Sequence, residues 1–143
     1  MKTIKLTLVA ASVFAFSACS GASDVPQINY SYNGQLEDVS GGKAFGAVNA
    51  NFAERYDLLA TFANLPATEG SDFYEGWIVK KVEGGEDNVI STGIVRKIED
   101  IYTNSFLSKD DLTDHDFYVL TLEPNDGDPA PAKHILEGTL KKK

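Results

Sequence analysis

The chain has 143 residues, of which 43% are hydrophobic and 24% are charged, and its formal net charge at neutral pH is −8. Such an acidic chain is poorly suited to nucleic acid, because that binding is driven by neutralisation of phosphates with lysine and arginine. The single cysteine excludes an intramolecular disulfide and a thiolate metal cluster. About 110 residues follow the N-terminal segments described next, which is enough for one domain with one core.

Residues 1–18 have the form of a secretory signal peptide. Lys2 and Lys5 are the only charged residues before Asp24, and residues 4–16 are largely apolar, which is the order of an exported leader. The apolar run is shorter than the roughly 20 residues that a membrane-spanning helix needs. Loss of the two lysines with the leader would change the net charge from −8 to −10.

The leader ends in the sequence Phe16-Ser17-Ala18-Cys19, which resembles a bacterial lipobox, with Phe16 where leucine is usual. In that motif the cysteine is lipidated and becomes the new N-terminus. We therefore expect an extracytoplasmic lipoprotein, anchored to a bacterial membrane by lipid on Cys19, with residues 19–27 as a flexible tether. Acyl chains contribute about 0.8 kcal/mol for each buried methylene, so several chains hold a domain durably. The alternatives are an unmodified thiol, free or buried, and a plain secretory signal that is cleaved nearby.

Residues 28–140 are dominated by the alternation of apolar and polar residues that is typical of half-buried strands. Seven strands are expected from this pattern, separated by turns rich in Gly, Asp and Asn. In chain order they cover residues 28–36, 44–52, 53–65, 73–82, 89–98, 117–123 and 134–140.

The third of these segments fits two patterns. Tyr56, Leu59 and Phe62 would share one face of a helix, whereas every second residue from Tyr56 to Phe62 is also apolar. A strand is favoured because strands lie on both sides and Asn64-Leu65-Pro66 ends the segment abruptly. A single helical turn is expected at 110–114, where Ser108 is placed to cap it.

Short connections favour antiparallel pairing, since parallel strands need long crossovers. The predicted fold is therefore all-β: a single antiparallel β-sandwich of about seven strands over residues 28–140. Residues 141–143 are three lysines, expected as a frayed basic tail, with contact to anionic lipid as the alternative.

Several motifs together resemble the extracytoplasmic C-terminal domain of anti-sigma-K-type factors. The similarity covers about residues 44–140 and rests on a Tyr-x-x-Trp strand, a glycine-containing strand and a Leu-Glu-Pro element followed by Gly-x-Pro-x-Pro. The matching residues are Tyr74, Trp77, Gly93, Thr121, Leu122, Glu123, Pro124, Gly127, Pro129 and Pro131.

This resemblance implies the fold and the extracytoplasmic side of the membrane. A full anti-sigma factor also has a cytoplasmic helical domain that holds the sigma factor and a transmembrane helix, and the sequence has neither. We therefore expect no binding of a sigma factor. The resemblance implies a stand-alone lipoprotein built on the sensor-side module, with an envelope protein as its partner.

The Asn125-Asp126-Gly127-Asp128 segment offers oxygen ligands of the kind that calcium prefers, but the spacing of an EF-hand is absent. A turn is the stronger interpretation, because Asp and Asn form local hydrogen bonds and Gly127 tolerates positive φ. The prolines Pro124, Pro129 and Pro131 remove backbone donors and exclude the segment from a central strand.

A second acidic cluster, residues 110–116, places His115 between Asp114 and Asp116. These three residues are weak candidates for a metal site, with a solvated loop as the default interpretation. The chain has no nucleophile elbow, phosphate loop or catalytic cysteine. We therefore expect no enzyme and no cofactor.

The aromatic strand 73–79 either contributes to the core or lines a ligand cleft, and the core is favoured. Glu75 shares a face with Phe73 and Trp77, so its burial would require a partner such as Arg55, Arg96 or Lys80. Taken together, the sequence predicts a binding or sensor-type module. A carrier of a small ligand or metal is the alternative.

Overall fold

The computed structural model describes residues 30–143, so the predicted leader and Cys19 lie outside the described residues. No helix in the described part is long and apolar enough to span a membrane. The fold is all-β, as predicted. The ten strands within residues 30–143 are β1 (Tyr32–Asp38), β2 (Phe45–Phe52), β3 (Tyr56–Ala63), β4 (Phe73–Lys80), β5 (Asn88–Ile94), β6 (Arg96–Ile98), β7 (Ile101–Ser108), β8 (Phe117–Glu123), β9 (Lys133–Thr139) and β10 (Lys141–Lys142).

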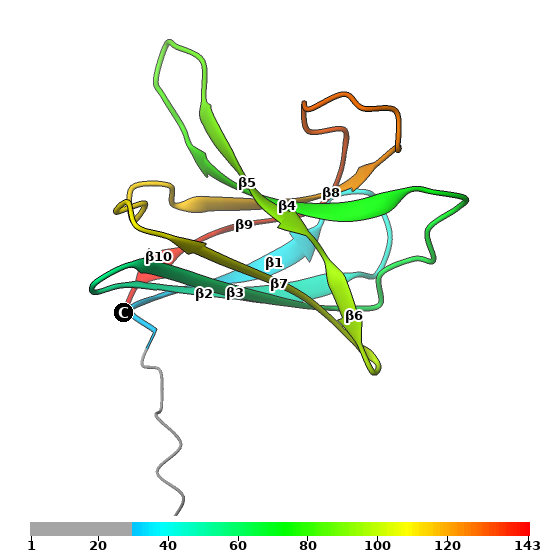
Figure 1. Cartoon of the computed structure of the whole chain (residues 1–143), viewed down its shortest axis with the longest axis horizontal. Helices are drawn as coiled ribbons and strands as arrows, with labels where there is room; N and C mark the ends of the chain where they lie inside the picture. The colour runs from blue at the N-terminus through cyan, green and yellow to red at the C-terminus, as the bar shows by residue number, and fades with distance from the viewer. Residues whose placement is uncertain (1–29) are drawn as a thin grey trace, which may run out of the picture.

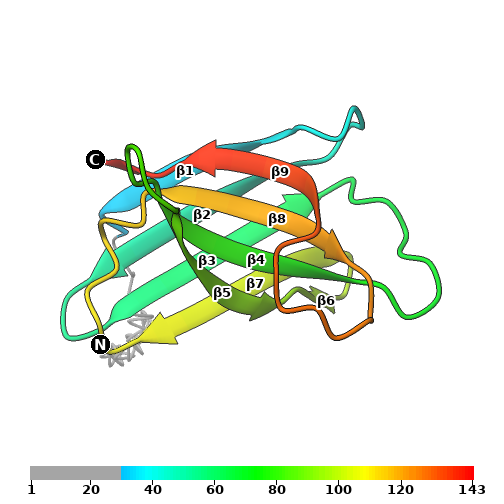
Figure 2. The same cartoon turned by 90° about the horizontal axis from the view of Figure 1, so that it is seen from above.

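All ten strands belong to one antiparallel sheet, in the order β5-β4-β8-β9-β1-β2-β3-β7-β6, with β10 paired to β1. The sheet curls until β5 lies across β7, so that it is nearly closed into a barrel (Figures 1 and 2). The prediction of antiparallel strands is confirmed. The structure differs from the predicted sandwich of about seven strands, because one sheet that folds over onto itself buries its inner face without a second sheet.

The inner face of the curled sheet forms the main core. The alternation in β3 buries Tyr56, Leu58, Ala60 and Phe62, each at most 3% exposed, so the prediction of a strand at 53–65 is confirmed. On the opposite side of the interior, β4 and β8 contribute side chains such as Ile78, Tyr118 and Leu120. The period of two residues therefore decides which side chains enter the core.

Strand β7 was not predicted, because apolar residues occur on both of its faces and give no clear alternation. Ile101 and Leu107 are more than half exposed, whereas the central inward residue is the polar Asn104, which is 2% exposed. The predicted helical turn at 110–114 is not a helix. Instead, the Ser108 hydroxyl accepts a hydrogen bond of 3.1 Å from the backbone nitrogen of Asp110. The C-terminal lysines are not frayed, since Lys141 and Lys142 form β10.

The barrel closes because one segment changes its partner. Residues 88–94 pair with β4, and residues 96–98 pair with β7. At the change of partner, Gly93 has φ +92° and the backbone nitrogen of Val95 still donates to the Tyr74 carbonyl over 2.8 Å. A β-bulge at Gly76/Trp77 in the β4–β5 ladder accompanies this bend.

Asn104 joins the two sides of this closure with its side chain. Its amide nitrogen donates to the carbonyls of Thr92 at 3.2 Å and Gly93 at 2.8 Å. Its amide oxygen accepts the hydroxyls of Thr92 at 2.6 Å and Tyr118 at 2.9 Å. Gly76 leaves room for this network, because a Cβ there would lie 2.5 Å from the Thr92 hydroxyl oxygen and 2.6 Å from the Asn104 amide oxygen.

Replacing Asn104 with alanine should lower the free energy of unfolding by about 3 kcal/mol, because several buried polar groups lose their partner at once. Urea denaturation followed by Trp77 fluorescence measures this change. The matched control is Ser105→Ala, which removes an exposed side chain from the same strand and should change stability by less than about 0.5 kcal/mol. Equal effects of the two substitutions would contradict a stabilising role for the network.

The turn between β1 and β2 is organised by the carboxylate of Asp38. It accepts hydrogen bonds from the backbone nitrogens of Ser40 (2.8 Å), Gly42 (3.0 Å) and Ala44 (2.9 Å), and from the Ser40 hydroxyl. These bonds, led by the one from the Ser40 side chain, lower the pKa of Asp38 to about 2. The charged form is therefore favoured in the folded state.

This pKa predicts a dependence of stability on acid. Because the folded pKa lies below the unfolded value of about 3.9, Asp38 should stabilise the fold above about pH 4, and its contribution should disappear as the pH falls through about 2. The measurement compares the unfolding free energies of the wild type and Asp38→Asn between these limits. The advantage of the wild type should shrink with acid; a constant difference would contradict the assignment.

Candidate binding groove

The outer face of β4 and β8 carries a second apolar cluster. Trp77 lies opposite Val119, and Val79 lies opposite Phe117, in the β4–β8 ladder. An outward face of a single sheet is normally open to water, yet Trp77, Val79 and Val119 are only 4–6% exposed. Something other than the barrel interior must therefore cover these side chains.

Two loops supply the cover. The loop between β4 and β5 and the loop between β8 and β9 both rise on the outer side of this face (Figure 1). A groove of about 160 Å³ is associated with this face. Its apolar lining consists of Trp77, Val79, Val89, Phe117, Val119 and Pro131, and its polar lining of Lys81, Asp87, His134 and Glu137.

The floor of the groove is fixed by hydrogen bonds. The indole nitrogen of Trp77 donates to the Thr121 hydroxyl oxygen over 2.8 Å, and that hydroxyl donates to the Glu75 carbonyl over 3.3 Å. Trp77 therefore has its polar atom satisfied and offers apolar ring surface to the groove. Glu75 is only half-buried, and its carboxylate accepts a hydrogen bond from the Ser91 hydroxyl.

The loop over residues 124–132 is a shaped connection between strands, as predicted. Asp126 accepts a hydrogen bond from the backbone nitrogen of Asp128 at 2.9 Å, and Asp128 accepts one from Ala130 at 3.0 Å. Gly127 has φ +84°. The carboxylates are thus used as local acceptors that hold the turns.

The loop is tied back to the barrel by a buried carboxylate. Glu123, only 4% exposed, accepts a hydrogen bond of 2.9 Å from the backbone nitrogen of Ala132. This contact joins the start of the loop to its end and holds the neighbouring Pro131 at the edge of the groove. The Leu-Glu-Pro element therefore has a structural explanation: Leu122 packs against the core, Glu123 anchors the loop and Pro124 ends the strand.

The polar side of the groove depends on a bulge in β9. In a regular strand, residues three apart face opposite sides. The register shift between Leu120 and Thr121 in the β8–β9 ladder adds one residue to β9, so His134 and Glu137 can face the same side. His134 Nδ1 lies 2.6 Å from Glu137 Oε1. The Glu137 carboxylate accepts this hydrogen bond, so the Nδ1–H group of His134 donates it.

Lys81 borders the groove from the opposite loop. Its ammonium nitrogen lies 4.2 Å from the centre of the Phe117 ring, a cation–π distance. In the same loop the Asp87 carboxylate accepts a hydrogen bond of 3.0 Å from the Val82 nitrogen, which shapes the hairpin. The groove thus combines aromatic walls with one cation and one histidine–carboxylate pair.

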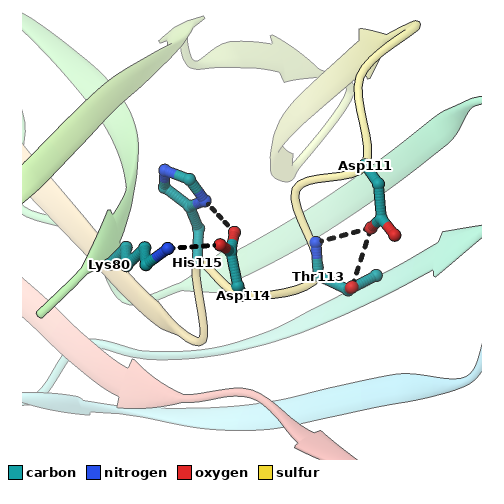
Figure 3. Close-up of polar contacts among 5 residues, drawn as sticks. All are labelled: Lys80, Asp111, Thr113, Asp114 and His115. Carbon is teal, nitrogen blue, oxygen red and sulfur yellow. Dashed lines mark hydrogen bonds and ion pairs between the residues drawn. The ribbon is translucent and has the colours of Figure 1, made fainter.

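The acidic loop has different chemistry (Figure 3). Asp114 Oδ2 lies 2.6 Å from Lys80 Nζ, and Asp114 Oδ1 lies 2.7 Å from His115 Nδ1. The hydrogen bond from Lys80 is the main reason that the pKa of Asp114 lies below its usual value. The Asp111 carboxylate accepts hydrogen bonds from the backbone nitrogen and the hydroxyl of Thr113.

These pairings leave the weak metal candidates without a cluster. Asp114 and His115 are brought together, but their contact uses the carboxylate oxygen and Nδ1, and Asp116 takes no part in it. Residues 30–143 contain no group of three or more side chains arranged to hold a metal ion. The buried Nε2 atom of His115 has no hydrogen-bond partner among the same residues.

The other motif residues serve the fold. Tyr74 is buried in the main core, and its hydroxyl donates to the Pro66 carbonyl over 2.9 Å. Gly93 lies where β5 leaves β4. The sequence analysis singled out Trp77 but missed Lys81, His134 and Glu137, because their proximity depends on two loops and a bulge that no local pattern signals.

A comparison with protein-family models, with curated proteins and with solved structures found no match to the chain. The resemblance to the anti-sigma-K C-terminal domain therefore stays a prediction.

Removing the Glu123 carboxylate should open the loop at 124–132. A hydrogen bond to a charged group contributes about 1.5–3 kcal/mol, so Glu123→Ala should raise the open population at least about tenfold. Proteinase K cleavage, mapped by mass spectrometry, should accelerate within residues 124–132. The exposed Glu86→Ala is the control and should leave the cleavage rate unchanged. Acceleration spread over the whole chain would instead indicate global destabilisation.

Proposed function

We propose that this protein is a non-catalytic binding or sensor-type module, anchored to the extracytoplasmic face of a bacterial membrane by lipid on Cys19, whose groove receives one apolar side chain of an envelope protein. The observation that carries this proposal is the apolar floor around Trp77, enclosed by two anchored loops. Neither nucleic acid nor a sigma factor is an expected partner.

The size of the groove favours a side chain over a whole small molecule. Sites for drug-sized ligands usually enclose about 300–1,000 Å³, whereas this groove measures about 160 Å³. A cavity of about 150 Å³ accommodates a single benzene ring. Aromatic side chains that fill such pockets are common energetic centres of protein interfaces.

A binding role also suits the polar lining. Nucleophilic catalysis by Ser, Thr or Cys requires one of these residues beside a base, and none of them lines the groove. Lys81 and the His134–Glu137 pair supply one donor and one acceptor at the rim, which suits recognition of the backbone next to an inserted side chain. The alternative, an envelope carrier of a small ligand or metal, would place the ligand in the acidic loop.

Two surface substitutions of the same kind test the proposal. Val89 lines the groove and is 40% exposed, whereas Val39 is 51% exposed and lies in the β1–β2 turn. Crosslinking in intact cells, followed by mass spectrometry, should capture one dominant envelope protein with the wild type and Val39→Arg. Val89→Arg should reduce this capture at least about tenfold, which is the effect expected from losing a central apolar contact.

Equal capture by both arginine variants would show that the partner binds elsewhere. If no envelope protein is enriched and a metal or sugar raises the melting temperature, the carrier function would replace the proposed one. Binding at 100 times the Kd stabilises a protein by about 2.7 kcal/mol, which a thermal shift detects.

A further inference from the structure

The C-terminal lysines are held beside the first described residues of the chain. Strand β10 pairs with the start of β1, and a last backbone hydrogen bond continues the ladder by one residue. The pairs are Lys141 with Asn33, Lys142 with Tyr32 and, over 2.9 Å, the nitrogen of Lys143 with the carbonyl of Ser31. Lys143 thus lies beside Ser31, near the start of the described domain.

The three lysines present unpaired positive charge. Their side chains are exposed, and none of them forms a salt bridge within residues 30–143. The adjoining acidic loop touches this end through a hydrogen bond of 2.7 Å from the Leu140 nitrogen to the Asp116 carbonyl. In that loop Asp114 is paired with Lys80. Because no carboxylate of residues 30–143 forms a salt bridge with the three lysines, they remain available to an external anion.

The position of these charges matters because the chain as a whole is acidic, with a net charge of −8. An acidic domain is repelled by an anionic bilayer unless it presents a basic region. Strand β10 and the C-terminus lie on the side of the molecule away from the two loops of the groove (Figure 1). From Cys19 to Tyr30 the chain extends at most about 40 Å, which keeps the lysines within reach of the membrane surface.

We propose that Lys141, Lys142 and Lys143 form a contact surface for anionic phospholipid head groups, which directs the groove away from the bilayer. This inference rests on the membrane anchoring proposed above. Each lysine near an anionic leaflet strengthens attraction on the order of fivefold, and salt screens this attraction within about 10 Å at 0.1 M. Because β10 is fixed to β1, the contact orients the whole barrel.

Energy transfer from Trp77, the only tryptophan, to a dansyl-labelled lipid measures how closely the domain rests on a vesicle. The protein is held by its own acyl chains or, where cells leave it unmodified, by coupling its single cysteine, Cys19, to a maleimide lipid. Transfer should rise when phosphatidylcholine vesicles are replaced by vesicles rich in phosphatidylglycerol. It should fall again in about 1 M salt, where the screening length is only about 3 Å.

Neutralising the tail with Lys141→Gln, Lys142→Gln and Lys143→Gln should abolish this rise. The matched control neutralises three exposed lysines elsewhere, Lys43, Lys97 and Lys133, and should behave like the wild type. The proposal is overturned if the tail variant responds like the wild type, or if neither protein responds to anionic lipid. An unmodified Cys19 in cells would refute only the anchoring, because the coupled protein still reports on the lysines.

Discussion

The hydrogen bonds of Asn104 are the constraint on which the closure of this barrel depends. A single curled sheet has two edges that must meet, and here the meeting is made by a segment that leaves β4 at Gly93 and joins β7 at Arg96. Between these pairings the backbone ladder is incomplete, and one amide side chain satisfies two carbonyls and two hydroxyls. A buried polar network of this kind specifies one arrangement of its neighbours, because any other leaves groups unpaired.

Closure in turn creates the outer groove. Once the inner face is sealed, the apolar residues of β4 and β8 that point outward have no barrel interior to enter, and the two long loops cover them. Each loop is anchored by a carboxylate that accepts a backbone hydrogen bond, Asp87 in one and Glu123 in the other. The groove is therefore preorganised, which lowers the entropic cost of receiving a partner.

Local patterns predicted the strands but not their assembly. The alternation in β3 identified its buried residues correctly, and the turn at 124–132 followed from its Asp, Asn and Pro content. Strand β7 was not predicted because a polar residue takes the central inward position and apolar residues occur on both faces. The groove could not be predicted from the sequence, since the approach of His134 to Glu137 depends on a bulge. The closure of a single sheet could not be predicted either, because it depends on a change of strand partner.

The backbone hydrogen bond between Lys143 and Ser31 brings the two ends of the domain together. Proteins whose termini meet at the surface tolerate circular permutation. A short linker joining these ends would let the chain be opened at the exposed Gly84-Gly85 hairpin without cutting any strand of the barrel. The same geometry would allow the domain to be inserted into a loop of a host protein. The two connections, at Ser31 and Lys143, would leave the domain at one point, so its opposite face would stay unobstructed.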